Sequence, residues 1–282
     1  MHHAQQVLRA SARAAACRAV NDLLQAAAES AQTLIAAAFG RAVPENPQGA
    51  RPDGTVTLPR RAEHGDLTAN HALIGAAALG LPPAELARRL ARNMDLDGSC
   101  FAAVDAAGAG FLNFMLSDAW YGAVLDEAAR LATPPTALAA PKTAADELRL
   151  FPRTDVVPVE ELSRRGDMAN GVYCVRYAYA RMGAVIENYA AAARPVYPAE
   201  RALIKLVAAL PGECACAGER RDAAALCGYA LRLADGFYAV YALHGYFSAD
   251  EHTLAQRLRL LAAARRALGY ALDRAGVNKN MI

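Results

Sequence analysis

The stretch Val172-Tyr-Cys-Val-Arg-Tyr-Ala-Tyr-Ala-Arg181 opens the part of the chain whose pattern decides the fold. From Val172 onward, apolar residues recur at three- and four-residue spacing, the period of amphipathic helices that pack through one face. These positions include Val185, Leu203, Leu206, Leu226, Leu233, Phe237, Leu254, Leu258, Leu261, Leu268 and Leu272. Gly276 follows them as a natural helix stop. We therefore predict an all-α helical bundle over residues 165–282.

Residues 1–118 have a mixed pattern, which predicts a small α+β domain. We expect helices over residues 5–39, residues 66–80 and Pro83–Arg92, and strands at Thr55–Leu58, Cys100–Val104 and Phe111–Leu116. Asp66 or Thr68 would cap the second helix. The chain is thus expected to be mainly α.

The segment between these domains, residues 119–164, reads as a helix followed by a linker. Residues 119–131 have a helical pattern, whereas residues 132–163 contain five prolines and indicate a linker or a collapsed remnant of a domain.

Composition and charge narrow the class of protein. Apolar residues make up 55% of the chain and aromatic residues 7%, which favours close-packed helices over β-sandwiches. Residues 1–164 carry 15 Lys and Arg against 18 Asp and Glu, and residues 165–282 carry 15 against 10. A polyanion would therefore favour the C-terminal half.

The six cysteines show no C-x-x-C spacing, so neither a zinc site nor a disulfide framework is expected. Reduced thiols and the lack of a membrane-length apolar run point to the cytoplasm. The arginines of the first 21 residues fit either an ordinary amphipathic helix or an organellar presequence.

Catalytic signatures are missing from the sequence. It contains no G-x-x-x-x-G-K-S/T, H-E-x-x-H or G-x-S-x-G motif, so we assign no catalytic residue, no cofactor and no metal. The basic pairs Arg164-Arg165, Arg220-Arg221 and Arg265-Arg266 suit either a track for a phosphate backbone or ordinary solvated helix faces.

Two N-terminal segments resemble the N-terminal domain of arginyl-tRNA synthetases. His64-Gly-Asp-Leu-Thr-Ala-Asn70 is similar to the family's H-G-D-Y-A-T-N, and Ala107-Gly-Ala-Gly-Phe-Leu-Asn-Phe114 to its A-G-P-G-F-I-N-F. The resemblance implies contact with the tRNA D-loop through Gly110, Phe111 and Asn113, because a ring can stack on an unpaired base and an amide can read its edge. The alternative is that Phe111 belongs to the strand core. Alternation places Phe111 and Asn113 on one face of the strand.

The C-terminal half resembles the anticodon-binding domain of the same family. Tyr173–Arg181 is similar to Y-Y-V-Q-Y-A-H-A-R, and Glu200-Arg-Ala-Leu-Ile204 matches a family helix. The resemblance implies that Tyr177, Tyr241 and Met281 stack on anticodon-loop bases and that Arg181 contacts phosphate or a base edge. Helix packing and an internal salt bridge are the alternatives. The chain departs from the family at Cys174, Arg176 and Tyr179, which bears on anticodon specificity.

In that family a large catalytic domain with H-I-G-H and K-M-S-K-S motifs lies between the two regions, and neither motif occurs here. The leading hypothesis is a non-catalytic arginyl-tRNA synthetase-like protein that binds tRNA of the arginine type and presents it to a partner enzyme. One alternative is the tRNA-binding half of a split arginine-tRNA ligase that acts in trans. The other is a protein-interaction module with decayed tRNA surfaces.

Overall fold

The computed structural model describes residues 23–43, 53–131, 134, 136–152, 157–188, 197–243 and 251–280. The chain forms two compact units, an N-terminal unit from Leu23 to Tyr121 and a C-terminal unit that includes Gly122–Ile282. The division falls within helix α4 (Asp118–Ala129). Within the described ranges, none of the helices combines the length and the apolar character that a membrane-spanning segment needs.

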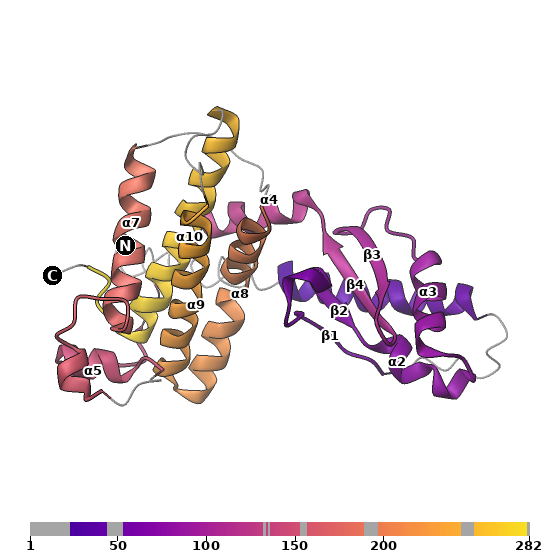
Figure 1. The fold of residues 1–282 in the computed structure, drawn as a ribbon, viewed down its shortest axis with the longest axis horizontal. Coiled ribbons are helices and arrows are strands. Elements are labelled where there is room, and N and C mark those ends of the chain that lie inside the picture. Colours follow the sequence, from indigo (N-terminus) through magenta and orange to yellow (C-terminus); the bar gives the residue numbers. More distant parts are fainter. Residues whose placement is uncertain are drawn as a thin grey trace, which may run out of the picture. The chain divides into compact units, whose positions relative to one another are not determined.

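The N-terminal unit is a four-stranded antiparallel sheet with helices, as predicted for a small α+β domain (Figure 1). The strand order is β1-β2-β4-β3. The strands are β1 (Val56–Thr57), β2 (Leu67–Ala69), β3 (Phe101–Ala107) and β4 (Phe111–Leu116). The helical elements are residues 23–42, η1 (Ala62–His64), α2 (His71–Gly75), η2 (Ala77–Leu79) and α3 (Pro83–Arg92).

The core of this unit lies on one face of the sheet. Strand β4 buries Leu112, Phe114 and Leu116, while Phe111 stays exposed, so successive side chains alternate between the two faces. Phe101 of β3 packs its ring 4.8 Å from that of Phe114. The helix over residues 23–42 and α3 supply further fully buried side chains: Ala31, Ile35, Leu86, Ala87 and Leu90. The opposite face of the sheet, on which Phe111 lies, is therefore not part of this core.

One expected helix was wrong at its start. Residues 67–69 form strand β2 instead of the first turn of a helix over residues 66–80. Asp66 is the reason, because its backbone N–H donates to the Phe114 carbonyl at 2.7 Å and its Oδ2 accepts from the Leu116 N–H at 2.8 Å. A carboxylate tied to β4 draws the next residues into the sheet. The expected helix over residues 5–39 is present from residue 23 to residue 42, and its earlier part lies outside the described residues.

The C-terminal unit is all-α, as predicted. Its long helices are α7 (Gly171–Asn188), α8 (Pro198–Arg220), α9 (Ala223–Tyr241) and α10 (Glu251–Ala275). They pack lengthwise in a bundle in which α7 contacts α9 and α10, and α8 contacts the same two helices (Figure 1). Asp222 caps α9 by accepting from the Ala225 N–H, and Gly276, at φ 85°, ends α10.

Small side chains line much of the inside of this bundle. Helix α10 buries six alanines almost completely: Ala255, Ala263, Ala264, Ala267, Ala271 and Ala275. Alanine has no side-chain entropy to lose in a helix and holds neighbouring helices at short distance. The high alanine content of the sequence is therefore used in the core of the bundle as well as for helix propensity.

The segment between the two predicted domains packs onto this bundle. It contains α5 (Ala144–Arg149) and α6 (Val159–Leu162) in addition to α4. The Leu138 N–H donates to the Arg274 carbonyl at 2.6 Å. A Cβ at Gly276 would lie 1.8 Å from the Ala139 carbonyl oxygen, so only glycine allows the two chain segments to cross there. Residues 136–152 thus belong structurally to the C-terminal unit.

A buried charge network joins three parts of that unit. Arg176 of α7 is 7% exposed, and its Nη2 donates to Oε2 of Glu147 of α5 at 2.6 Å. The Nε of Arg176 donates to the Asn278 carbonyl at 2.6 Å, and the Asn278 N–H donates to Oε1 of Glu147 at 2.9 Å. Each polar group of the network therefore has a hydrogen-bonding partner within it. A buried ion pair needs such partners in order to be stable.

We predict that replacing either Glu147 or Arg176 with alanine lowers the free energy of unfolding by about 3–5 kcal/mol, because each change leaves one buried charge without its partner. The double variant should lose less than the sum of the two single losses. Urea unfolding followed by circular dichroism measures all three. Arg232→Ala is the control, since it breaks an exposed pair with Glu213 and should cost at most about 1 kcal/mol. Losses that simply add would contradict the network.

Candidate nucleic-acid interface

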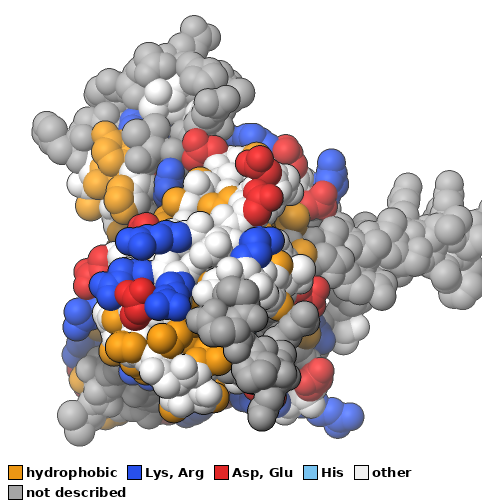
Figure 2. Space-filling model, turned by 90° about the vertical axis from the view of Figure 1, so that its right-hand side faces the viewer, with side chains coloured by type: hydrophobic (Ala, Val, Ile, Leu, Met, Phe, Trp, Pro, Cys, Tyr) orange, Lys and Arg blue, Asp and Glu red, His pale blue; other side chains and the backbone are white. Residues whose placement is uncertain are grey.

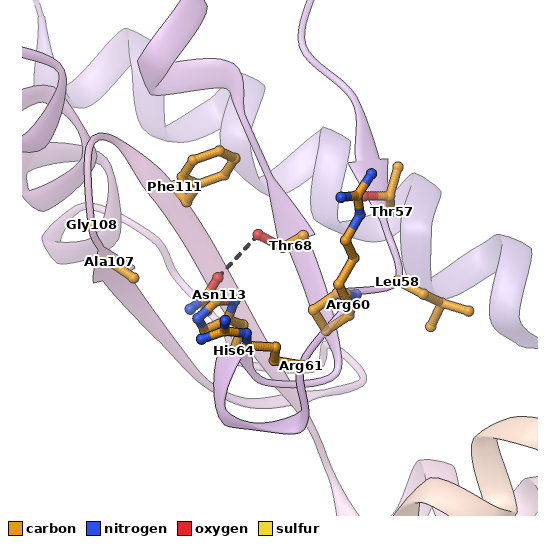
Figure 3. Close-up of a pocket in the computed structure, with 11 residues that line it drawn as sticks. Thr57, Leu58, Arg60, Arg61, His64, Thr68, Ala107, Gly108, Phe111 and Asn113 are labelled. Carbon is orange, nitrogen blue, oxygen red and sulfur yellow. Dashed lines mark hydrogen bonds between the residues drawn. The ribbon is translucent and has the colours of Figure 1, made fainter.

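The open face of the N-terminal sheet carries a pocket of about 560 Å³, called the sheet pocket here. Its walls come from the segment after β1, from β2, from the β3–β4 turn and from β4 (Figure 3). The residues that line it are Thr57, Leu58, Pro59, Arg60, Arg61, His64, Thr68, Ala107, Gly108, Phe111 and Asn113. The sheet pocket therefore combines apolar, amide and cationic groups.

Two of the predicted D-loop residues, Phe111 and Asn113, lie in this pocket. Both residues line the same pocket, as expected for one face of β4, but they differ in burial: Phe111 is 37% exposed, whereas Asn113 is only 6% exposed. Asn113 is opposite Thr68 in the sheet, and its Oδ1 accepts from the Thr68 hydroxyl at 3.0 Å. That hydrogen bond holds the amide in one orientation, as a group that reads a base edge requires.

Gly110, the third predicted D-loop residue, does not line the pocket. It has φ 118°, and a Cβ there would lie 2.7 Å from the Cβ of Pro83 at the start of α3. Gly110 thus lets the β3–β4 turn approach α3 closely, which sets the position of Phe111 as the next residue. Gly65 is constrained in the same way, because its Cβ would lie 2.8 Å from the Phe114 carbonyl oxygen.

The cationic side of the pocket was missed from the sequence. Arg60, Arg61 and His64 follow β1, and both arginines are exposed. Arg61 forms one exposed pair with Glu63 at 3.4 Å, which neutralises it only weakly. The sequence feature that could have revealed these cationic residues was the Arg60-Arg61 pair, which lies just before the motif that begins at His64. Figure 2 shows basic side chains interspersed with acidic and apolar ones on the face it draws.

A row of three aromatic rings lies on the C-terminal unit, called the tyrosine row here (Tyr173, Tyr177 and Tyr238). The rings of Tyr173 and Tyr177 are stacked with centroids 6.0 Å apart, and those of Tyr177 and Tyr238 with centroids 6.5 Å apart. Tyr177, a predicted anticodon-loop residue, is 37% exposed. Tyr173 could have been predicted to lie beside Tyr177 from their four-residue spacing on α7. Tyr238 belongs to α9, and no sequence feature indicated that it lies beside them.

Two other predicted residues, Arg181 and Tyr241, meet beside this row. The Nε of Arg181 donates to the Tyr241 hydroxyl at 3.0 Å, its Nη2 donates to the same oxygen, and its Cζ lies 5.2 Å from the ring centroid. The hydrogen bond that Arg181 donates to the Tyr241 hydroxyl raises the pKa of Arg181 above its usual value. The partner is a neutral hydroxyl, so the guanidinium is held in place while its charge remains available.

Met281, the fourth predicted anticodon-loop residue, lies outside the described residues. Phe237 is completely buried and belongs to the core of the bundle. Burial raises the pKa of the Tyr238 hydroxyl far above its usual value, and that hydroxyl donates to the Cys174 carbonyl at 3.0 Å. Tyr238 is therefore fixed as a neutral, oriented ring.

The three departures from the family pattern have internal partners here. Cys174 is buried, and Arg176 belongs to the buried network with Glu147. Tyr179 lies under the guanidinium of Arg265, whose Cζ is 4.1 Å from the ring centroid and whose Nε donates to the Tyr179 carbonyl. Arg265 is thus a packing residue, which leaves it a poor candidate for a backbone track.

No group of His, Cys, Asp and Glu side chains among the described residues is arranged to hold a metal ion. The five described cysteines are free thiols, and burial raises the pKa of Cys227 to about 12.

Comparisons with known proteins identify both units. Residues 28–116 match the model of the arginyl tRNA synthetase N terminal domain, and residues 175–279 match that of the DALR anticodon binding domain. The chain therefore combines these two domains, with residues 117–174 between the matches. It is an arginyl-tRNA synthetase-like chain.

Curated relatives match the N-terminal region. The arginine–tRNA ligase of Nitratidesulfovibrio vulgaris is 46% identical over 72 residues, which are 25% of this chain and 13% of that protein. The ligase of Jannaschia sp. is 42% identical over 73 residues, or 26% and 12%. The ligase of Acetivibrio thermocellus is 37% identical over 70 residues, or 25% and 12%. The matched segments thus span only a small part of those ligases.

We predict that Gly110→Ala lowers the stability of the N-terminal unit by about 2 kcal/mol or more, because it combines an unfavourable φ with a clash against Pro83. Gly108→Ala is the matched control, since Gly108 also has positive φ, at 51°, but its Cβ would meet nothing within 4 Å; it should lose about 1 kcal/mol. The sole tryptophan, Trp120, donates a hydrogen bond from its Nε1 to the Leu23 carbonyl. Its fluorescence therefore measures the unfolding of this unit during denaturation. Equal losses would contradict the close packing.

Proposed function

We propose that this chain, which joins an arginyl-tRNA synthetase N-terminal domain to a DALR anticodon-binding domain, binds tRNA without aminoacylating it. The two domains support a tRNA-binding role. The proposal goes further in assigning the anticodon loop to the tyrosine row and the D-loop to the sheet pocket, on a tRNA of the arginine type.

The observation that carries the proposal is the arrangement of Tyr177 and Arg181. Tyr177 presents an exposed ring at the centre of the stacked tyrosine row. Arg181 lies one helical turn further along α7 and forms no ion pair with a carboxylate among the described residues. A splayed-out loop base can stack on the ring, and the adjacent guanidinium can bind its phosphate or its polar edge.

The sheet pocket supports the second contact. Phe111 offers a ring for stacking, Asn113 an oriented amide, and Arg60 and Arg61 a positive charge at the rim. These are the groups that single-stranded RNA requires, since its unpaired bases are read by stacking and by hydrogen bonds to their edges. In an N-terminal half with more acidic than basic residues, such a site would select an unpaired base by its shape and polar edge more than by overall charge.

Two roles fit such a protein. In the first, which we favour, it holds a tRNA for a partner enzyme. In the second, it is the tRNA-binding half of a split arginine-tRNA ligase whose catalytic domain is a separate chain. Arginine-dependent ATP–pyrophosphate exchange separates them: we expect none from the pure protein, and restoration by a separate catalytic chain would favour the second role. A protein-interaction module becomes the better account if no tRNA binds.

We predict that Tyr177→Ala weakens binding of an anticodon stem-loop by about 1–3 kcal/mol, the usual contribution of a base–aromatic stack, with an unchanged salt dependence. Arg181→Ala should also weaken binding and should reduce the slope of log affinity against log salt by about 1, since one fewer counterion is released. Filter binding across a salt series measures both quantities.

Tyr177→Phe is the control for stacking, because it keeps the ring, and it should bind almost as tightly as the unchanged protein. Equal affinity of the unchanged protein for the stem-loop and for an unrelated hairpin at physiological salt would refute the anticodon assignment.

We predict that Phe111→Ala and Asn113→Ala weaken binding of whole tRNA with an intact D-loop and leave binding of the isolated anticodon stem-loop unchanged. The loss for Phe111→Ala should be about 1–3 kcal/mol. Thr68→Val removes the hydroxyl that orients Asn113 but keeps the amide, so it should lose less than Asn113→Ala. Competition binding with whole tRNA and with a D-loop-deleted tRNA tests this. Equal losses on both RNAs would place the contact elsewhere.

A further inference from the structure

A second pocket, of about 330 Å³, lies at the start of α7 and is called the arginine pocket here. Its lining includes Arg164, Arg165 and Arg176, together with Asn170 and Tyr173. Three of these described residues are arginines and none is acidic. A concave surface with this charge is suited to an anion.

The three arginines differ in how far their charge is already neutralised. Arg176 is buried and paired with Glu147 at 2.6 Å. Arg165 pairs with Glu161 at 3.1 Å, but the Arg165 side chain is 38% exposed and that of Glu161 61%, so solvent screens the pair and it is weak. Arg164 is exposed and makes no side-chain hydrogen bond or ion pair with the described residues. The pocket therefore retains positive charge, and Arg164 is its most available donor.

The loop that carries Arg164 and Arg165 is held in place by a buried amide. Asn170 is 6% exposed, and its Nδ2 donates to the carbonyls of Arg165 at 3.0 Å and Ser163 at 3.4 Å. Its Oδ1 accepts from the Tyr173 N–H at 3.1 Å. These bonds tie the loop to α7, so the pocket is formed before any ligand arrives, which reduces the entropy cost of binding.

The arginine pocket is continuous with the tyrosine row. Tyr173 both lines the pocket and stacks on Tyr177. Tyr173, Tyr177 and Arg181 recur every four residues along α7, so the first and the last lie about 12 Å apart along the helix axis. That length corresponds to about three stacked base steps of ~3.4 Å. Cationic side chains thus stand at both ends of a surface that can hold a short stretch of single-stranded RNA.

We propose that the arginine pocket binds a backbone phosphate of the RNA loop whose bases lie on the tyrosine row, with Arg164 as the principal donor, and that Tyr173 is an additional stacking surface there. This inference rests on the proposed function and assigns a second subsite to it. Guanidinium groups match phosphate geometry, and phosphate contacts fix the position of a nucleic acid without reading its sequence. The pocket would set which loop bases reach Tyr177 and Arg181.

The test uses the full chain and anticodon stem-loops in which one loop phosphate at a time is replaced by an uncharged methylphosphonate. Arg164→Ala should bind the unmodified stem-loop about fivefold more weakly at 0.15 M salt, the effect of one counterion. One methylphosphonate should weaken binding by the unchanged protein and have no effect on Arg164→Ala. Tyr173→Ala should weaken binding about tenfold and Tyr173→Phe very little.

Arg266→Ala is the matched control, because it removes the same charge from an exposed position of α10 outside the pocket. It should remain sensitive to the same methylphosphonate. The inference is overturned if Arg164→Ala binds like the unchanged protein, or if it stays sensitive to every modified linkage. A stem-loop that binds the unchanged protein and all pocket variants alike would overturn the inference and leave the proposed function standing. Failure of the unchanged protein to bind would overturn both.

Discussion

The buried pair of Glu147 and Arg176 sets the rotation of α7, and the proposed RNA surface of the C-terminal unit depends on that rotation. Arg176 points inward to Glu147 and to the Asn278 carbonyl. Its neighbour Tyr177 must then point outward, in line with Tyr173 and Arg181. Burial of Val175, Ala178 and Met182 favours the same rotation of α7, and the ion pair adds the cost of an unpaired charge to any other rotation. The penalty for leaving a buried charge unpaired therefore protects the arrangement of the tyrosine row, although neither Glu147 nor Arg176 belongs to that row.

The two candidate sites use the same chemistry on different architectures. In the sheet pocket, strand alternation exposes Phe111 and turns Asn113 toward Thr68. On the bundle, four-residue spacing places Tyr173, Tyr177 and Arg181 in one row, in which Tyr173 is half-buried and the other two are exposed. In both places an aromatic ring is paired with a polar group held by a neutral hydroxyl, from Thr68 in one case and Tyr241 in the other. A hydroxyl orients its partner without cancelling a charge, which leaves the polar group able to bind a ligand.

Local pattern was enough to predict much of this structure. The bundle helices, the end of α10 at Gly276 and the two faces of β4 each depend on residues close in sequence. The one misplaced element involves a distant partner, because β2 forms where Asp66 bonds to β4. The packing of residues 136–152, left open between a linker and a collapsed remnant, also depends on distant partners, because Glu147 and Ala139 meet the end of α10 and the residues after it. For the same reason Tyr177 could be proposed from its motif, whereas Tyr238 became a candidate only when α9 was placed beside α7.

The alanines that α10 turns inward have a consequence for how this chain can diverge. In a core built from large side chains, a loss of volume at one position can be offset by a gain at another, so many different core sequences are tolerated. The buried alanine side chains of α10 cannot become much smaller, and any larger residue in their place would push two helices apart. Substitutions are then tolerated mainly on the outside of the bundle, where the residues of the proposed RNA surface lie. Such a scaffold keeps its shape while its recognition surface changes, so relatives of this chain could exchange one RNA for another without first acquiring a new fold.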